Sequence, residues 1–119
     1  MTAQKLEDID RAIEDYKALK LKVAITELDI TIEGAGGGQL GGARGATPPP
    51  QSAESLQAQA EAYAKVFAIF VKHRDVINRV TFWGLNDRRS WRAGQSPLVF
   101  DRENQPKPAF QAILSVATH

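Results

Sequence analysis

Residues 22–30 read Lys-Val-Ala-Ile-Thr-Glu-Leu-Asp-Ile, and this stretch decides the fold. β-branched and other apolar residues fill most of it, which predicts a β-strand. The stretch has no clean polar face until its C-terminal end, so burial on both sides is expected, as in a parallel sheet. Alternation along the strand puts four residues on one face: Val23, Ile25, Glu27 and Asp29. The strand therefore begins with core residues and ends in carboxylates.

Helical patterns lie on both sides of this strand in the sequence. Residues 6–19 carry apolar side chains at helical spacing: Leu6, Ile9, Ile13, Tyr16 and Leu19. Residues 53–74 carry a second apolar stripe, made of Leu56, Ala60, Tyr63, Phe67, Phe70 and Val71. Ser52 or Ser55 is expected to cap this second helix. A last short helix is expected to begin at Pro106 or Pro108, with Phe110, Ile113, Leu114 and Ala117 facing inward.

A second strand is predicted over residues 78–85, Asn-Arg-Val-Thr-Phe-Trp-Gly-Leu. Strands that alternate with helices imply a parallel pair joined by a right-handed crossover. The crossover helix covers one face of that pair. We expect the other face, with Val23, Ile25 and Thr81, to lie bare unless the last helix folds over it. Two strands are few for an α/β domain, so the pattern resembles two units of a larger repeating α/β architecture.

Length and composition limit the classes of function. The chain has 119 residues, 43% of them hydrophobic and 24% charged, with a formal net charge of +1 and no cysteine. This near-neutral balance gives no electrostatic reason to expect nucleic acid or a membrane surface as partner. The lack of cysteine excludes disulfides, thiolate metal sites and cysteine nucleophiles. No apolar run is long enough to span a bilayer, and no export signal is visible near Met1.

A long Gly/Pro-rich connection is expected over residues 31–53. It contains Gly36-x-Gly38-x-x-Gly41, which fits the dinucleotide-binding fingerprint. That fingerprint must lead directly into a helix N-terminus, whereas more glycines and Pro48–Pro50 intervene here. A flexible insertion is therefore the better interpretation, and a compact nucleotide-binding domain is disfavoured.

Candidate catalytic and sugar-binding residues follow the two strands. Glu27 and Asp29 lie at the C-terminal end of the first strand, where parallel α/β proteins build their active sites, although they could simply mark its exit into solvent. Trp83 ends the second strand, and Trp91 lies in the polar loop after it. Indole rings stack on sugar rings. Trp83 could instead be an ordinary core residue, which is the common position of a tryptophan in a strand. Trp91 lies in a polar loop, where few core positions exist.

Other polar residues in the sequence have simpler explanations. Arg88, Arg89 and Arg92 could grip an anion, with a solvated loop as the default. His73 lies late in a predicted helix, where it is expected to interact with the helix dipole. With His119 at the terminus and no cysteine, a transition-metal site is not expected.

Several segments, in order, resemble glycoside hydrolase family 10, the xylanase family whose fold is a (β/α)8 TIM barrel. Val23–Ile30 is similar to the family's seventh strand, and Val80–Gly84 is similar to the eighth. Ser90-Trp91-Arg92 resembles the loop that follows. Residues 97–101 and 106–110 resemble the closing segment. The resemblance implies an α/β fold comprising the C-terminal quarter of the barrel, from helix 6 through strand 7, helix 7 and strand 8 to helix 8.

The resemblance also assigns roles. Glu27 would be the nucleophile of a retaining mechanism, and Asp29 would belong to its supporting network. Trp83 and Trp91 would bind the sugar, and the substrate would be β-1,4-xylan or a xylo-oligosaccharide. No cofactor and no metal are implied, and secretion is expected because it is typical of the family. Residues 1–119 would then form part of a catalytic domain, with an insertion at 31–53.

Two departures from the family pattern limit this expectation. The family's acid/base glutamate lies on the fourth strand and the histidine beside the nucleophile on the sixth, and neither segment occurs in this sequence. We therefore expect the chain to be inactive alone, unless Glu33 or Asp87 acts as the acid. We also expect it to fold poorly or self-associate without the remainder of the barrel. The alternative is a non-catalytic glycan-binding or assembly module. A smaller departure is Lys20, at a turn that favours glycine.

Overall fold

The computed structural model describes residues 1–32 and 51–118. Its main elements are helix α1 (Ala3–Ala18), strand β1 (Val23–Leu28), helix α2 (Ala53–Lys72), strand β2 (Ile77–Phe82) and helix α3 (Pro108–Ala117). Two short 3-10 turns, η1 (Asp87–Arg89) and η2 (Ala93–Gln95), lie in the β2–α3 loop. The predicted order of elements is confirmed. The glycine fingerprint lies outside the described residues.

The two strands form a parallel sheet, as predicted, but their register is irregular. Ile25 pairs with Val80 and Leu28 pairs with Phe82, so three steps along β1 match two along β2. This β-bulge reverses the alternation. Leu28, rather than Glu27, packs with Val23 and Ile25 against the helices. The prediction that Glu27 shares a face with Val23 and Ile25 is wrong, because simple alternation ignores the extra residue.

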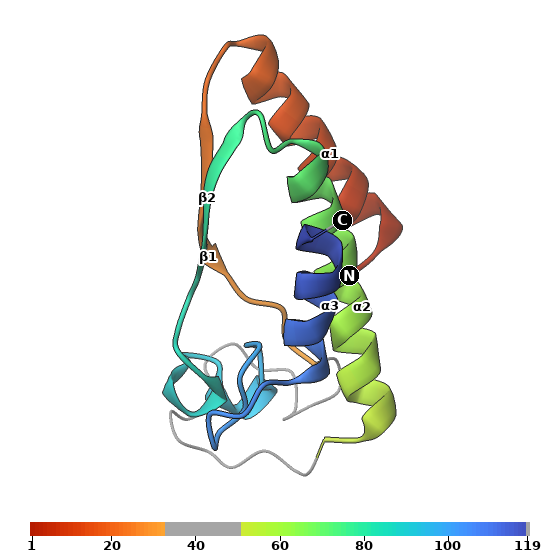
Figure 1. Ribbon diagram of the computed structural model, residues 1–119, viewed down its shortest axis with the longest axis vertical. Helices are drawn as coiled ribbons and strands as arrows, with labels where there is room; N and C mark the ends of the chain where they lie inside the picture. Colours follow the sequence, from red (N-terminus) through yellow and green to blue (C-terminus); the bar gives the residue numbers. More distant parts are fainter. Residues whose placement is uncertain (33–50, 119) are drawn as a thin grey trace.

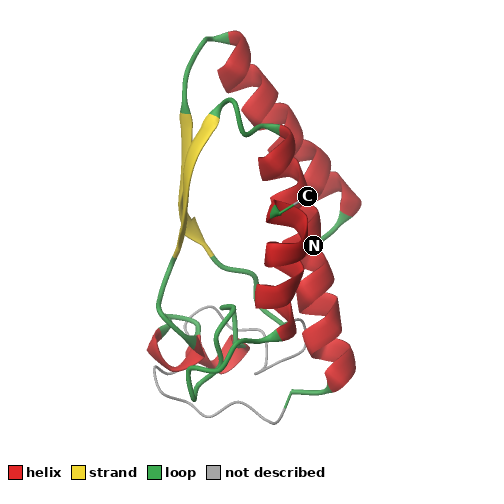
Figure 2. Cartoon of the chain, in the orientation of Figure 1, coloured by secondary structure: helices red, strands yellow, loops and turns green. Residues whose placement is uncertain are grey.

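Helices α1, α2 and α3 all lie on one side of the sheet (Figures 1 and 2). Val23, Ile25 and Val80 contact a core made by α1, α2 and the loop before β2: Ile13, Val66, Phe70 and Val76. A second cluster, Ala60, Tyr63, Val99 and Ala109, joins α2 to α3. The predicted burial of the sheet on both sides is therefore wrong for the described residues, because α3 packs on α2 instead of folding over the sheet.

The uncovered face of the sheet consists of exposed residues: Ala24, Thr26 and Glu27 on β1, and Asn78, Arg79 and Thr81 on β2. Thr81 lies on this face as predicted. Val23 and Ile25 do not, because they point toward the helices. A sheet with helices on one face only is incomplete by the standard of parallel α/β proteins, whose sheets are covered on both faces.

Local sequence signals explain where the helices begin and end. Thr2 caps α1 and Ser52 caps α2, each accepting a hydrogen bond from a backbone amide three residues on. Pro108 occupies the first turn of α3. Lys20, after α1, has a φ of 60°, the left-handed conformation for which glycine is favoured. No helix in the described part of the chain is both long and apolar enough to cross a membrane.

The apolar stripe predicted for the first helix extends beyond the residues that are buried in the structure. Leu6 and Ile9 pack on the core around Ile13, but Tyr16 and Leu19 are exposed. They lie in the last turn of α1 and at its C-cap, respectively. Helical spacing alone therefore overstates the buried face of α1.

Candidate functional site

The C-terminal ends of β1 and β2 lie side by side, at the end of the molecule that also carries the β2–α3 loop (Figure 1). The Trp83 amide donates to the Leu28 carbonyl at 3.0 Å, which extends the strand pairing beyond Phe82. This bond brings the residue that follows β2 next to Asp29, which follows β1. The predicted candidates from the two strands therefore meet at one edge of the sheet.

Trp91 joins this edge from the loop. Its Nε1 donates to Asp29 Oδ2 at 2.9 Å, and the Arg92 guanidinium lies over its ring at 4.3 Å from the centroid. The hydrogen bond and the cation–π contact fix the orientation of the indole. Trp91 nevertheless remains 37% exposed and Trp83 48% exposed. Trp91 is therefore held in place, and both aromatic surfaces are open to a ligand.

A hollow of about 570 Å³ lies beside these rings. It is lined by Trp83, Gly84, Arg88, Arg89, Ser90 and Trp91. Its described lining does not include Glu27, which is exposed on the uncovered face of the sheet. The structure thus brings Trp83 and Trp91 to one hollow and links Asp29 to it by a hydrogen bond, while Glu27 lies outside the hollow.

Gly84 is required where β2 leads into this hollow. Its φ is +137°, and an added Cβ would lie 2.8 Å from Leu98 Cδ1. A side chain at this position would therefore combine backbone strain with a steric clash. The chain turns here so that Trp83 stays at the surface while Leu98 is buried.

The β2–α3 loop is held from inside by a buried ion pair that the sequence analysis missed. Asp87 Oδ2 lies 2.9 Å from Lys107 Nζ, and both residues are nearly inaccessible to solvent. Asp87 Oδ1 accepts from the Leu98 amide, and Lys107 Nζ also donates to the Ser96 and Leu98 carbonyls. The only sequence signal is the placement of a lysine between two prolines. Asp87 is buried within this pair, which argues against the role of acid considered for it.

Burial governs the ionisation of this pair. Desolvation raises the pKa of Asp87 despite the opposing attraction of Lys107. It also lowers the pKa of Lys107 despite the opposing attraction of Asp87. Every proton of the Lys107 ammonium nonetheless has an acceptor. The pair therefore fixes the shape of the loop that carries Trp91, at a desolvation cost.

Helix α2 supports the site from behind. The Tyr63 hydroxyl donates to the Pro97 carbonyl and accepts from the Ile30 amide, and burial raises the pKa of this hydroxyl. Gln59 Nε2 donates to the Ile30 and Ser96 carbonyls. The backbone after β1 is thereby tied to the β2–α3 loop, so the positions of Asp29 and Trp91 are set by one framework.

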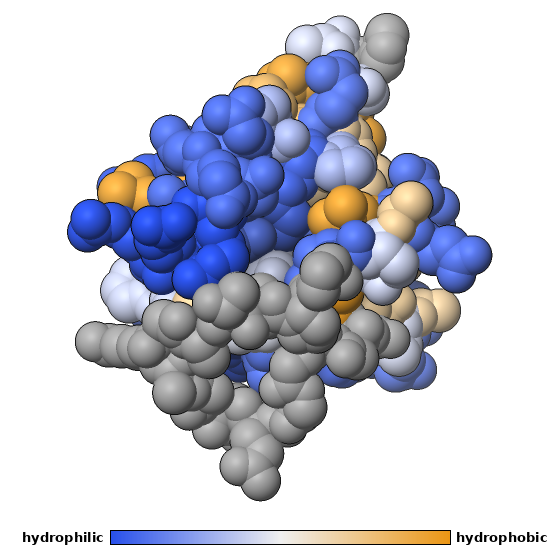
Figure 3. Space-filling view, turned by 90° about the horizontal axis from the view of Figure 1, so that it is seen from below, coloured by the Kyte–Doolittle hydropathy of each residue, from blue (hydrophilic) through white to orange (hydrophobic). Residues whose placement is uncertain are grey.

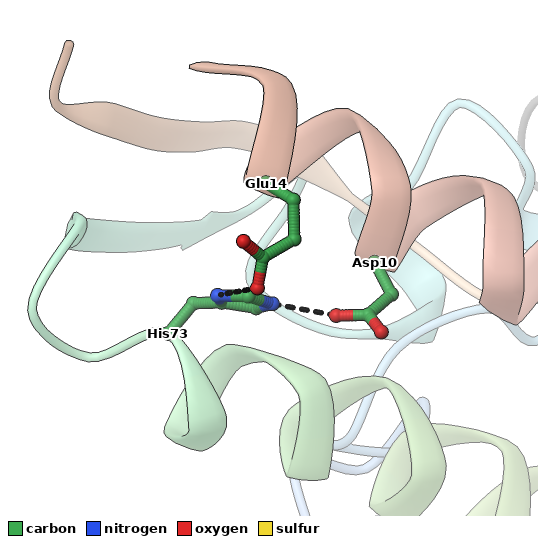
Figure 4. A group of neighbouring side chains, drawn as sticks. All are labelled: Asp10, Glu14 and His73. Atoms are coloured by element: carbon green, nitrogen blue, oxygen red, sulfur yellow. Dashed lines mark hydrogen bonds and ion pairs between the residues drawn. The ribbon is translucent and has the colours of Figure 1, made fainter. Parts of the chain in front are cut away.

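A second polar cluster lies between α1 and α2, away from this site (Figure 4). His73 is the C-cap residue of α2, and its buried side chain lies against α1, with Nε2 2.5 Å from Asp10 Oδ1. Glu14 approaches the other ring nitrogen at 3.7 Å, and Lys72 bonds to Asp10. Three possible metal ligands meet here. However, the two carboxylates face different ring nitrogens of His73, and the Asp10 carboxylate is already paired with the Lys72 ammonium. The arrangement fits a clamp between helices better than a metal site.

Parallel strands with carboxylates and exposed tryptophans at their C-terminal ends are typical of the β/α-barrel glycoside hydrolases. The sequence profile described as glycosyl hydrolase family 10 matches residues 1–116. This chain belongs to that family. The family resemblance stated from the strand motifs is confirmed, and the chain covers part of a (β/α)8 barrel.

Individual relatives agree with this assignment. An endo-1,4-beta-xylanase/feruloyl esterase of Xylanibacter ruminicola is 40% identical, over 90% of this chain and 15% of that protein. An endo-1,4-beta-xylanase of Geobacillus stearothermophilus is 36% identical, over 93% of this chain and 34% of the enzyme. A mutant of the intracellular xylanase TsXylA from Thermoanaerobacterium saccharolyticum, in complex with xylotetraose, matches with a TM-score of 0.72 and 30% identity, over 91% of this chain and 29% of that one. The chain spans 15% to 34% of the length of these proteins.

Proposed function

We propose that this chain forms the nucleophile side of the active site of a retaining endo-1,4-β-xylanase. In this proposal, residues 1–119 are the C-terminal part of the barrel, from its sixth helix to its eighth, with an insertion at 31–53. The observation that carries the proposal is the hydrogen bond from Trp91 to Asp29. It joins a sugar-stacking surface to the carboxylate-bearing end of the neighbouring strand.

Each predicted residue has a distinct role in the proposed reaction. Glu27 attacks the anomeric carbon, the glycosidic C–O bond breaks, and a covalent glycosyl-enzyme ester forms. Water then hydrolyses this ester with net retention. Asp29 holds Trp91, while Trp83 and Trp91 bind the sugar rings beside the bond being cut. β-1,4-Xylan or a xylo-oligosaccharide is the proposed substrate, as supported by relatives that are xylanases and by one solved with xylotetraose.

Protonation of the departing sugar oxygen requires a second carboxylic acid on the other side of the bond. Glu27 lies in β1 and Asp29 directly after it, so both approach the bond from one side. Without a positioned acid the reaction loses about 10²–10⁴-fold in rate. We therefore expect no measurable xylanase activity from the isolated chain. The uncovered sheet face supports self-association of the chain when it is alone, or assembly with the rest of a barrel.

Complementation tests this function. The Geobacillus stearothermophilus enzyme, truncated before the segment that this chain matches, is co-expressed with the 119-residue chain, and reducing sugar released from xylan is measured. Activity is expected only from the pair, and Glu27→Gln should lower it at least about a thousandfold. Glu103→Gln, which changes an exposed glutamate in the β2–α3 loop, serves as the matched control. A 2-fluoro-xylobioside with a good leaving group should label the Glu27 peptide in mass spectrometry.

One result would reject the proposed nucleophile, and another would reject the expected inactivity of the isolated chain. Full activity of the Glu27→Gln pair would exclude Glu27 as nucleophile. Xylan turnover by the chain alone, abolished by Glu27→Gln, would reveal an acid within the chain. If neither complementation nor labelling occurs but xylo-oligosaccharides bind, the second candidate applies. That candidate is a non-catalytic glycan-binding or assembly module, and it is favoured by the exposed tryptophans and by the exclusion of Glu27 from the hollow.

A further inference from the structure

Strand β1 has one edge that no strand covers in the described part of the chain. The sheet contains two strands, so β2 occupies one edge of β1 and the other edge is open. The Val23 amide donates at 3.0 Å to the Val76 carbonyl, which directly precedes β2. Because backbone groups point alternately to the two edges of a strand, the amide and carbonyl of Ala24 point to the open edge. Such an edge is a template for pairing with another strand.

The charges along this edge change from basic to acidic. Lys20 and Lys22 precede β1, whereas Glu27 lies near its end and Asp29 directly follows it. The residues between these two groups are uncharged. Two copies of such a strand bring like charges together when they pair in parallel, and opposite charges together at both ends when they pair antiparallel. β2 lacks this pattern, because Arg79 is its only charged residue.

We propose that two copies of this chain form a dimer by antiparallel pairing of the open edges of β1, with the two-fold axis beside Ala24. In this register Ala24 lies opposite Ala24 of the second copy, and the two exchange backbone hydrogen bonds. Val23 lies opposite Ile25 of the second copy, and both side chains are on the helix side of the sheet. The contact uses the same surface on both copies, so it closes as a dimer.

The bulge in β1 fits this register. Thr26 and Glu27 both lie on the exposed face, and at a bulge two residues oppose one residue of the neighbouring strand. Together they oppose Lys22 of the second copy, which places the Glu27 carboxylate beside the Lys22 ammonium. Beyond the bulge, Leu28 lies opposite Leu21, so apolar side chains meet again on the helix side of the sheet. One register therefore matches both the charges and the apolar residues.

The side chains that make these contacts are accessible. Lys22 is exposed, and its ammonium donates to the Asp75 carbonyl at 2.6 Å. This neutral acceptor leaves two protons of the ammonium for a carboxylate, which is the stronger partner. Glu27 is exposed, and no ion pair within the described residues involves it.

Apolar side chains are also exposed where α1 leads into β1. Tyr16, Leu19 and Leu21 are 49%, 68% and 50% exposed, respectively. Figure 3 shows the other end of the sheet, where hydrophilic residues make up most of the described surface in view and hydrophobic residues are scattered among them. The start of β1 thus offers apolar surface directly beside the open edge, which favours a protein contact there.

This dimer goes beyond the proposed catalytic role and does not depend on it. In the proposed barrel, the same edge of β1 pairs with a strand of the missing part. In the dimer that edge is occupied and Glu27 is engaged by Lys22. The dimer and the complemented pair therefore exclude each other, so excess truncated enzyme should dissociate the dimer if both proposals hold.

Sedimentation equilibrium of the full 119-residue chain tests the pairing. The unaltered chain should form a dimer that weakens as salt is added, because the ion pairs are exposed. Lys22→Glu and Glu27→Lys should each raise the dissociation constant about tenfold to a hundredfold, because each change replaces two attractive pairs with two repulsive ones. Lys65→Glu and Glu61→Lys, which make the same changes in charge at exposed positions of α2, should leave the dissociation constant unchanged.

Mixing the two charge variants provides the decisive comparison. An equimolar mixture of Lys22→Glu and Glu27→Lys should recover the dimer, because one strand is then acidic at both positions and the other is basic at both. Recovery also shows that each variant alone is folded. A loss of dimer that mixing does not restore would overturn the proposed pairing.

A single cysteine locates the two-fold axis. The chain has no cysteine, so Ala24→Cys introduces one thiol. The Cα atoms of a hydrogen-bonded antiparallel pair lie about 5.5 Å apart, within the range that a disulfide spans. Mild oxidation should therefore give a covalent dimer of Ala24→Cys at least about tenfold faster than of Thr81→Cys, which lies on the exposed face of β2.

The remaining outcomes separate this dimer from the proposed function. A chain that stays monomeric at all concentrations rejects the dimer and leaves the complementation experiment unaffected. Faster cross-linking of Thr81→Cys would show that the uncovered sheet faces stack, and a dimer insensitive to both charge reversals would place the contact elsewhere; either result rejects pairing through β1. If the charge variants and Ala24→Cys behave as expected but complementation fails, the dimer stands and the proposed function is rejected alone.

Discussion

The two ends of the sheet are held by different kinds of polar interaction. At the carboxyl ends of the strands, the buried Asp87–Lys107 pair organises the loop that carries Trp91. At the amino ends, exposed groups meet: Lys17 pairs with Asp75, and Lys22 donates to the Asp75 carbonyl. Exposed pairs contribute little to stability, whereas breaking a buried pair is costly. The end that carries the candidate site is therefore the one whose geometry tolerates the least change.

The largest effect is expected from Lys107→Met. This change leaves the Asp87 carboxylate buried without its partner, which costs about 3–5 kcal/mol. Urea unfolding at one fixed protein concentration measures the loss, and faster hydrogen exchange at the Leu98 amide locates it in the loop. Arg79→Met, at an exposed position on β2, should cost far less.

A double variant sharpens this prediction. Asp87→Asn with Lys107→Met removes both charges and keeps a carbonyl oxygen that can accept from the Leu98 amide. Because the penalty comes from an unpaired charge, the double variant should be more stable than Lys107→Met alone. If the two destabilisations simply add, the ion pair is not what constrains this loop.

A smaller loss is expected from Tyr63→Phe, also at the site end. The change removes the hydroxyl that bonds the Ile30 amide and the Pro97 carbonyl, although these two backbone groups also bond each other at 3.2 Å. It should therefore cost about 0.5–1.5 kcal/mol in the free energy of unfolding, the net value of a hydrogen bond. Tyr16→Phe, an exposed tyrosine on α1, should have no measurable effect. Equal urea midpoints for the two variants would contradict a supporting role for Tyr63.

At the other end, Asp10→Asn should change the dependence of stability on pH. Hydrogen bonds from Lys72 and His73 hold the pKa of Asp10 below its usual range. A lowered folded pKa stabilises the fold above the unfolded pKa of about 3.9, and this contribution is lost as the pH falls through the folded value. The urea midpoint of the unaltered chain should therefore fall more steeply below pH 4 than that of Asp10→Asn. Parallel curves would contradict this, and Asp8→Asn on the same helix is the control.

The smallest effect is expected from Lys20→Gly, and it should be a gain. The left-handed backbone at φ 60° is strained for lysine, but glycine also increases the entropy of the unfolded chain. These opposing terms leave a net stabilisation of about 0.5 kcal/mol or less. Differential calorimetry should detect a small rise in Tm, and a fall would show that the turn does not strain Lys20.

Local patterns in the sequence predicted the elements well but their surroundings poorly. The cap at Ser52, the start of α3 at Pro108, the parallel pairing and the left-handed turn at Lys20 all follow from a few neighbouring residues. The side of the sheet on which Glu27 lies could not be predicted in this way, because the extra residue in β1 depends on the pairing with β2. The Asp87–Lys107 pair could not be predicted from neighbouring residues either, because its members are separated by 20 positions and meet only in the folded loop.

Among the candidate residues, Trp91 was the most informative at the sequence level, because a tryptophan in a polar loop has little core to enter. Its hydrogen bond to Asp29, 62 positions away, was not predictable from either residue alone. The family assignment, by contrast, needed only the order of the strand motifs.

The bulge in β1 has a consequence for anyone who redesigns this strand. Deleting one residue between Ile25 and Leu28 would make the hydrogen-bond ladder with β2 more regular, and methods that reward ideal geometry would favour the deletion. Only deletion of Thr26 keeps the acid, because Glu27 then stands alone between inward-facing Ile25 and Leu28 and stays on the exposed face. Regular alternation at full length would instead turn Glu27 toward the apolar side of the sheet, where an unpaired carboxylate is strongly disfavoured. At its full length the strand needs its irregular pairing to keep the acid in contact with water, so the choice of which residue to delete decides whether a more regular sheet keeps the proposed nucleophile.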